Sequence, residues 1–197
     1  MRNQWYGDER DLVKWGTLLH LAKTHGAVRI VQVAYLRPDE KEYALYSKSG
    51  SFQIDPAILD HFRDLSDIQR LSESSGVEID VFKDPFGGIR NDYHNRLTQY
   101  LVGYPDPKIV FLDPDTGIAP ANFNYKHVKP DEIRTVFDSL KTGDVLVFYQ
   151  HARQRVRTWR EDTLNDFIQA LDKTENEVDM ITGNGIANDV AFFIAKK

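Results

Sequence analysis

The sequence predicts an α/β fold, in which a doubly wound, mostly parallel sheet ends in an antiparallel C-terminal hairpin. Apolar segments of strand length alternate with segments of helical periodicity along most of the chain. Segments 108–112 (KIVFL) and 145–149 (VLVFY) are apolar almost throughout, as expected for parallel strands buried on both faces. The last two strand-like segments, 178–182 and 190–195, have a short connection, which favours antiparallel pairing.

The composition favours one domain over residues 1–197, without repeats or linker-like tracts. The chain has no cysteine, which excludes disulfides and metal centres held by thiolates. Its formal net charge of -5 means that any contact with nucleic acid must come from a local patch. No apolar run approaches the roughly 20 residues of a membrane span, and the first six residues lack a signal-peptide core. We therefore expect a cytoplasmic protein.

The first half of the chain opens with a helix that begins at Asp8, whose side chain can cap it, and ends at Gly26. Its apolar residues recur at helical spacing and are expected to face the core: Leu12, Trp15, Leu18, Leu19 and Ala22. A buried strand over 28–36 follows, and the stretch up to residue 52 is ambiguous. Next come a helix over about 56–74 and a short strand over 77–82.

In the second half, helices stand before, between and after the strands 108–112 and 145–149. They are expected over about 91–103, 130–140 and 159–171. In open sheets of this kind, ligands bind outside the carboxyl ends of the strands. The sequence therefore predicts a site formed by the residues that follow Leu36, Leu112 and Phe148.

The strongest functional signal comes directly after the strand 108–112, in the run Asp113-Pro114-Asp115-Thr116-Gly117. Two carboxylates and a hydroxyl on a tight turn can bind a cation, accept protons or accept hydrogen bonds from an amine. Turns prefer the same residue types for conformational reasons alone, so a plain turn with solvated acids is the alternative.

Tyr149-Gln150-His151 forms a second signal at the end of the other apolar strand. Polar side chains at the exit of a buried strand are expected to face the ligand cleft. His151 can serve as a base or a ligand, or it can simply begin a polar loop.

A third signal lies on the first helix, where Asp11 and Lys14 are three residues apart and can pair on one face. Such pairs are usually found at the surface, where they contribute little to stability. The sequence leaves open whether this pair is a surface pair or lines the cleft.

A fourth signal is basic. Four arginines lie close to Trp159 in the sequence, namely Arg153, Arg155, Arg157 and Arg160, and a second group comprises Arg90, His94 and Arg96. Arginines beside an aromatic ring suit contact with phosphate and stacking on bases, which suggests nucleic acid as a partner. The alternative is a solvated loop and helix face.

Two resemblances follow from these motifs. The chain resembles, over nearly its whole length, a family of mostly uncharacterised bacterial and phage proteins. The resemblance is carried by Asn3-Gln4, Gly7-Asp8, Asp11, Lys14, Gly16, Leu112-Asp113-Pro114-Asp115-x-Gly117 and Tyr149-Gln150-His151. The opening Gly7-Asp8-x-x-Asp11-x-x-Lys14 is also similar to the start of the bacterial large-subunit ribosomal-RNA adenine-N6 methyltransferase. That resemblance implies a Rossmann-like fold that binds S-adenosylmethionine.

The methyltransferase resemblance also implies roles for individual residues. Asp113-Pro114 stands where N-methyltransferases carry Asp/Asn-Pro-Pro-aromatic, whose acid and backbone carbonyl hold the target amine. The expected catalytic residues are Asp113, Pro114, Asp115 and His151. The cofactor would contact Asp8, Asp11, Lys14 and Tyr35. The substrate would contact Thr116, Tyr149, Gln150, Arg153, Arg155 and Arg157. Two features depart from the pattern: no glycine-rich loop follows the first strand, and Asp115-Thr116 replaces Pro-aromatic.

A rival resemblance is to phosphatases of the haloacid-dehalogenase type. It rests on Asp113-x-Asp115 and on the run Gly183-Asn184-Gly185-Ile186-Ala187-Asn188-Asp189, in which Asn184 replaces a metal-binding aspartate. This alternative implies a Mg²⁺-dependent phosphohydrolase or nuclease with Asp113 and Asp115 as metal ligands. A third hypothesis is a non-catalytic binding module on the same fold.

Overall fold

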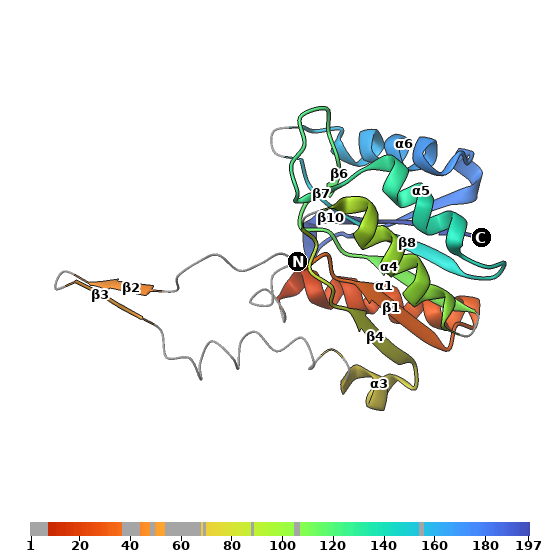
Figure 1. The fold of residues 1–197 in the computed structure, drawn as a ribbon, viewed down its shortest axis with the longest axis horizontal. Coiled ribbons are helices and arrows are strands. Elements are labelled where there is room, and N and C mark those ends of the chain that lie inside the picture. Colours follow the sequence, from red (N-terminus) through yellow and green to blue (C-terminus); the bar gives the residue numbers. More distant parts are fainter. Residues whose placement is uncertain are drawn as a thin grey trace.

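The computed structural model describes residues 8–36, 44–47, 50–53, 68, 70–87, 89–104, 107–153 and 156–197. Its main sheet has six strands in the order β4-β1-β5-β8-β10-β9 (Figure 1). These strands are β1 (Arg29–Val33), β4 (Glu78–Phe82), β5 (Lys108–Leu112), β8 (Val145–His151), β9 (Val178–Gly183) and β10 (Ala187–Lys196). The pairs among β4, β1, β5 and β8 are parallel, whereas β10 is antiparallel to both β8 and β9. The predicted mostly parallel sheet with antiparallel C-terminal strands is confirmed.

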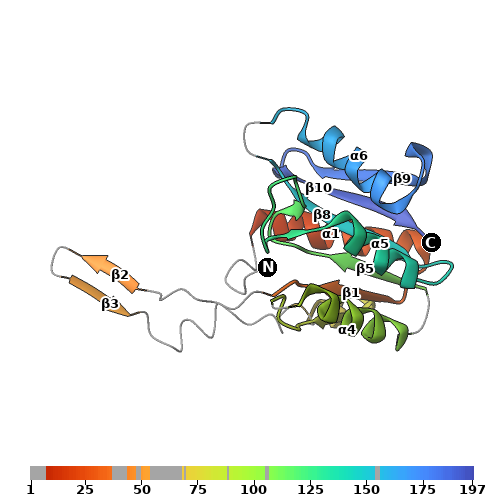
Figure 2. The ribbon, with the colours of Figure 1, turned by 45° about the horizontal axis from the view of Figure 1, so that its top comes forward.

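Helices cover both faces of this sheet (Figure 2). The helices α1 (Glu9–His25) and α3 (Arg70–Ser75) pack on one face, and α4 (Arg90–Val102), α5 (Pro130–Ser139) and α6 (Trp159–Leu171) pack on the other. Each face has its own apolar cluster, one including Leu18 and Ile30 and the other including Leu97 and Val110. The sheet is therefore doubly wound, as its apolar strands predict.

Strands β1 and β5 end at the same level, whereas β8 continues for three residues beyond this level to His151. Val33 of β1 lies opposite Leu112 of β5, and Leu112 lies opposite Phe148 of β8. The backbone N–H of Asp113 then donates to the carbonyl of Val33 over 3.0 Å. The turn after β5 therefore begins hydrogen-bonded to β1.

The ends of α1 agree with the sequence. The Asp8 carboxylate accepts hydrogen bonds from the backbone N–H of Arg10 at 2.9 Å and of Asp11 at 3.1 Å. Gly26 ends the helix in the left-handed conformation, with φ of 65°. Both predicted boundaries are confirmed.

The predicted apolar face of α1 is wrong at one position. Leu12 is 64% exposed, whereas Asp11 and Lys14 are buried. The physical reason is the rotation of the helix, which turns the ion-paired polar side chains toward β5 and leaves Leu12 on the outside.

Other segments differ from the expectation in length. The strand expected over 28–36 ends as β1 at Val33, because Tyr35 adopts a left-handed backbone with φ of 46°. Of the helix expected over about 56–74, residues 56–67 and 69 lie outside the described part, and α3 begins at Arg70. The ambiguous stretch contains an antiparallel pair, β2 (Ala44–Ser47) and β3 (Gly50–Gln53).

Short elements complete the chain: β6 (Gly117–Ile118), β7 (His127–Val128) and the 3₁₀ turn η3 (Glu175–Glu177). At the amino ends of the strands, Lys108 Nζ pairs with Asp144 Oδ2 over 2.8 Å, and both side chains are almost fully buried. Within the described ranges, no helix combines the length and the apolar character needed to cross a lipid bilayer.

Candidate functional site

The strand order creates a topological switch point between β1 and β5. From β1 the chain moves outward to β4 on one side, and then returns to β5 on the other side. In open α/β sheets, the crevice at the carboxyl ends of two such strands is where ligands bind. The turn that begins at Asp113 leaves β5 at this place.

Lys14 joins the first helix to this turn. Its Nζ lies 2.9 Å from Asp11 Oδ1 and 3.0 Å from Asp113 Oδ2. Gln32 Nε2 donates to the same oxygen of Asp113 over 2.7 Å. The most exposed of these four side chains is only 7% exposed, at Lys14 and Asp11 alike, so the Asp11–Lys14 pair is not a surface pair. We call these four residues the Lys14 cluster.

The charge of Lys14 is maintained by its neighbours. Burial alone lowers the pKa of Lys14, but the negative charges of Asp113 and Asp11 outweigh burial and hold the pKa well above its ordinary value. The ammonium also lies 5.3 Å from the centroid of the Tyr149 ring. Burial raises the pKa of the Tyr149 phenol, which stays neutral. Two carboxylates facing one ammonium give the cluster a formal charge of -1.

Tyr35 occupies the position where a glycine-rich loop was expected. Its φ of 46° is a conformation that glycine usually supplies and that costs other residues about 1–3 kcal/mol. Its ring is 2% exposed and packs in the core, 4.9 Å from the ring of Phe86 and 5.4 Å from that of Tyr93. The sharp turn after β1 is therefore present without glycine, and the ring of Tyr35 lies away from solvent.

Gln150 holds the turn that carries the remaining polar residues. Its Oε1 accepts from the N–H of Ile118 at 2.9 Å, and its Nε2 donates to the carbonyls of Thr116 at 3.1 Å and His151 at 2.7 Å. Gly117 has φ of 124°, and a Cβ there would lie 2.1 Å from Gln150 Oε1. The fully buried amide of Gln150 thus fixes the loop after Asp113, which is a positioning role.

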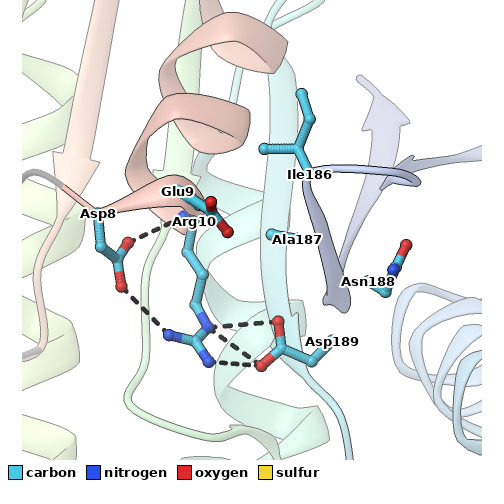
Figure 3. Close-up of a pocket in the computed structure, with 7 residues that line it drawn as sticks. All are labelled: Asp8, Glu9, Arg10, Ile186, Ala187, Asn188 and Asp189. Atoms are coloured by element: carbon cyan, nitrogen blue, oxygen red, sulfur yellow. Dashed lines mark hydrogen bonds and ion pairs between the residues drawn. The ribbon is translucent and has the colours of Figure 1, made fainter.

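A chain of charged groups lies beside the start of α1 (Figure 3). Arg10 Nη2 lies 2.6 Å from Asp189 Oδ2, and Arg10 Nη1 lies 3.1 Å from Asp8 Oδ2. His151 Nε2 is 3.3 Å from the same oxygen of Asp189. The hydrogen bond from Arg10 lowers the pKa of Asp189. A pocket of about 400 Å³, lined by residues 8–10 and 186–189, opens here.

The other predicted residues of the turn differ in burial. Pro114 is buried, and Asp115 and Thr116 are half-buried. The structure brings Asp11, Lys14 and Asp113 together and places His151 in the separate group around Asp189.

Most of the basic residues already have partners within the protein. Arg153 pairs with Asp166 at 2.9 Å, and Arg160 donates to the carbonyl of Asn188. Arg157 is exposed, and Arg155 lies outside the described residues.

The second basic group does not form a common surface. Arg90 makes two hydrogen bonds of 2.5 Å to Glu132, and Arg96 pairs with the exposed Asp84. His94 is 4% exposed, and burial lowers its pKa. Arg90 and Arg96 are therefore engaged by carboxylates of the protein itself, and His94 lies in the interior.

Sequence reasoning missed three members of the site. Gln32 is the only uncharged polar residue in the strand sequence RIVQV. A buried amide in an apolar strand needs a hydrogen-bond partner, so this residue could have been predicted to contact another polar group. Arg10 and Asp189 are 179 residues apart, and nothing in their local sequence predicts their contact.

The motif that resembled a phosphatase loop forms the β9–β10 hairpin. Its Asp189 is engaged by Arg10, and its Asn188 accepts a hydrogen bond from the N–H of Gly185 at 3.0 Å. Asp113 is paired with Lys14. Among the residues that the structure describes, no three histidine or acidic side chains gather as a metal site would require.

No known protein-family model matches this sequence, and no curated protein is significantly similar to it. Among solved structures, the chain is similar to a proposed methyltransferase from Thermobifida fusca YX, with a TM-score of 0.41 and 10% identity over 96% of this chain and 80% of that one. It is also similar to a DUF574 family protein from Streptomyces avermitilis MA-4680, with a TM-score of 0.42 and 10% identity over 96% and 82% of the two chains. Similarity at this level carries no argument about function, which must come from the site.

Proposed function

We propose that this protein is an S-adenosylmethionine-dependent methyltransferase that acts on an amine of a nucleic acid. The observation that carries the proposal is the Lys14 cluster, which joins α1, β1 and β5 at the switch point of the sheet. The strand order gives further support, because β10 runs antiparallel between β8 and β9. An antiparallel closing hairpin is what the resemblance to methyltransferases implies for the second half of the fold.

The residues present fit this cofactor in charge. S-adenosylmethionine carries a positive sulfonium and a zwitterionic amino-acid end. The Lys14 cluster brings the carboxylates of Asp11 and Asp113 to the switch point, and carboxylates attract a cation. An ammonium can donate three hydrogen bonds, and Lys14 uses two of them on Asp11 and Asp113, so a third is available for a carboxylate. The left-handed turn at Tyr35 supplies the bend that glycine provides in related sites.

When bound, the cofactor supplies an electrophilic methyl group. In the proposal, Asp113 and the carbonyl of Pro114 accept hydrogen bonds from the target amine and orient its lone pair. Lys14 and Gln32 hold one carboxylate oxygen of Asp113 and so fix the direction of the other. Gln150 keeps Thr116 and Ile118 in place beside the amine. His151 lies next to Asp189, where it can take up the proton that the amine releases.

The first test is a thermal-shift measurement with S-adenosylhomocysteine, without added metal. A ligand at 100 times its dissociation constant stabilises the folded state by about 2.7 kcal/mol, which gives a clear rise in Tm. If S-adenosylhomocysteine produces no shift at millimolar concentration, the proposal fails.

The second test measures transfer of a labelled methyl group to nucleic acid. The Asp113→Asn variant keeps the side-chain shape but weakens acceptance from the amine, so it should lose transfer. Because Asp113 also belongs to the Lys14 cluster, the thermal shift with S-adenosylhomocysteine should be reduced but still detectable. Asp138→Asn, a surface change at a weak ion pair with Lys197, is the matched control and should transfer normally. Circular dichroism verifies that both variants fold.

A second candidate is the non-catalytic binding module. Asp113 is only 3% exposed and is ion-paired, and a carboxylate with a purely structural role has the same two properties. In that case Asp113→Asn would leave partner affinity unchanged, and no transfer would be detected with the parent protein. The phosphohydrolase alternative has no comparable support and predicts activity that a chelator abolishes.

A further inference from the structure

The chain after the Asp113 turn forms a surface segment with an unusual composition. Residues 119–129 read APANFNYKHVK, with two aromatic rings, two lysines and a histidine but no acidic residue. The chain as a whole has 30 acidic residues and a net charge of -5. We call residues 119–129 the basic aromatic segment.

This segment is fixed at both ends to the candidate site. It begins directly after β6 and includes β7 near its end, and these strands pair Gly117 with His127 and Ile118 with Val128. Ile118 is in turn held by the Gln150 side chain at 2.9 Å. Figure 1 shows the segment projecting from the end of the sheet where α1 begins, beside the carboxyl ends of the parallel strands. A group bound to the segment would therefore lie close to Asp113.

The two aromatic rings are presented to solvent by an ordered turn. Phe123 is 45% exposed and Tyr125 is 59% exposed. Asn124 lies between them, and its side-chain oxygen accepts a hydrogen bond from the N–H of Lys126 at 2.9 Å, while its carbonyl accepts from the N–H of His127 at 3.1 Å. The turn holds the backbone between the rings, so little ordering is needed when a ligand stacks on them.

Positive charge gathers around the same rings. Lys129 Nζ lies 5.3 Å from the centroid of the Phe123 ring. Burial lowers the pKa of His127, and the positive charges of Arg153, Lys126 and Arg90 lower it further. Arg153 is paired with Asp166 and Arg90 with Glu132, so the segment's own positive charge is that of Lys126 and Lys129. Phosphate groups would be attracted to such a surface.

We propose that the basic aromatic segment is the binding surface for single-stranded nucleic acid, on which bases stack against Phe123 and Tyr125 while Lys126 and Lys129 contact phosphates. This inference rests on the proposed function and adds the substrate class to it. Aromatic rings can stack on any base, and cations along the strand supply affinity without sequence preference. The segment also supplies the aromatic surface that the Asp113-Pro114-Asp115-Thr116 motif itself lacks.

The test uses fluorescence anisotropy with labelled oligonucleotides of mixed sequence, about 12 nucleotides long, as single-stranded DNA, single-stranded RNA and duplex DNA. The double variant Phe123→Ala/Tyr125→Ala should bind the preferred single strand at least tenfold more weakly, because each stacked base contributes roughly five- to a hundredfold in affinity. The matched control is Val28→Ala/Val102→Ala, which removes two exposed apolar side chains outside the segment and should bind like the parent.

A second measurement examines the phosphate contacts. Lys126→Ala/Lys129→Ala should lower the slope of log affinity against log salt by about 1 to 2, as expected when two phosphate contacts are lost. The DNA and RNA arms show which strand is preferred. Equal or tighter binding of duplex, or no binding of any oligonucleotide by the parent, would overturn the inference. An unchanged affinity in the aromatic double variant would do the same.

The two proposals can fail separately. All variants of the segment should retain the thermal shift with S-adenosylhomocysteine, because the rings lie outside the Lys14 cluster. If the parent protein binds the cofactor analogue but no oligonucleotide, the inference about substrate is wrong and the proposed cofactor stands. If it binds oligonucleotides through Phe123 and Tyr125 but not the analogue, the binding-module hypothesis gains.

Discussion

Lys14 and Asp113 are 99 residues apart in the sequence, and their side chains meet at 3.0 Å in the interior of the protein. The contact ties the first helix to the carboxyl end of the central strand β5. Asp11 on the same helix also accepts a hydrogen bond from Lys14, at 2.9 Å. Two motifs that look independent in the sequence are therefore one structural unit.

Removing the charge of Lys14 should strongly destabilise the protein. In Lys14→Met, the buried carboxylate of Asp113 loses its cation and Asp11 loses the same contact, which costs about 3–5 kcal/mol for a broken buried pair. Urea unfolding monitored by tryptophan fluorescence measures this loss. Lys23→Met, at an exposed position of the same helix, is the control and should change stability by less than about 0.5 kcal/mol.

Gly117→Ala should be costly because of Gln150. The new Cβ would stand 2.1 Å from Gln150 Oε1, and φ at this position is 124°. Gly143 also has a positive φ, of 100°, but its nearest contact would be 3.9 Å, so Gly143→Ala measures backbone strain alone. We expect Gly117→Ala to lose more stability than Gly143→Ala by at least about 1 kcal/mol.

A double-mutant cycle separates the two causes at Gly117. If the clash with Gln150 dominates, Gly117→Ala made in a Gln150→Ala background should cost about as much as Gly143→Ala does. Thermal or urea unfolding of the four proteins provides the cycle. Additive effects would show that Gln150 is not what requires glycine here.

The buried pair Lys108–Asp144 should stabilise the fold without contributing to the site. Asp144→Ala removes the carboxylate that contacts the buried ammonium of Lys108 and the backbone N–H groups of Lys108 and Lys141, so we expect a loss of about 3–5 kcal/mol. Asp138→Ala, whose partner Lys197 is 3.5 Å away at the surface, should cost under about 1 kcal/mol. Where enough Asp144→Ala folds at low temperature, it should still bind S-adenosylhomocysteine.

The Arg10–Asp189 pair gives a pH dependence of defined sign. The hydrogen bond from Arg10 lowers the pKa of Asp189 below its value of 3.8 in the unfolded chain. Its contribution to stability is therefore fully present above that value and is lost as the pH falls through the lower folded pKa. The stability difference between the parent and Asp189→Asn should shrink below about pH 4. A difference that grows as the pH falls from about 4 to about 2 would contradict this assignment.

The sheet was predictable because its strands are apolar and bounded by clear turn signals. Segments 108–112 and 159–171 coincide with β5 and α6, where apolar periodicity and flanking polar residues agree. β1 ends earlier than its apolar sequence suggests, since Tyr35 turns left-handed in a pocket of other rings. Local sequence rarely predicts such a backbone at a residue other than glycine.

The candidate site was predictable in its elements and not in its contacts. Asp113 was predicted because ligands bind outside the carboxyl ends of parallel strands. The burial of Lys14 was not predicted, because it depends on the rotation of α1 about its axis on the sheet. Leu12 shows this limit, because periodicity alone assigned it to the core and the buried ion pair displaced it.

The position of β10 has a consequence for how the protein is made. β8 and β9 do not touch each other; each is hydrogen-bonded to β10, which follows both of them in the sequence. On the ribosome, β8 therefore stays an open edge until residues 187–196 have emerged and can insert beside it. A stalled or clipped nascent chain that lacks this segment would expose the apolar edge of β8, which makes it a target for chaperones and prone to aggregate.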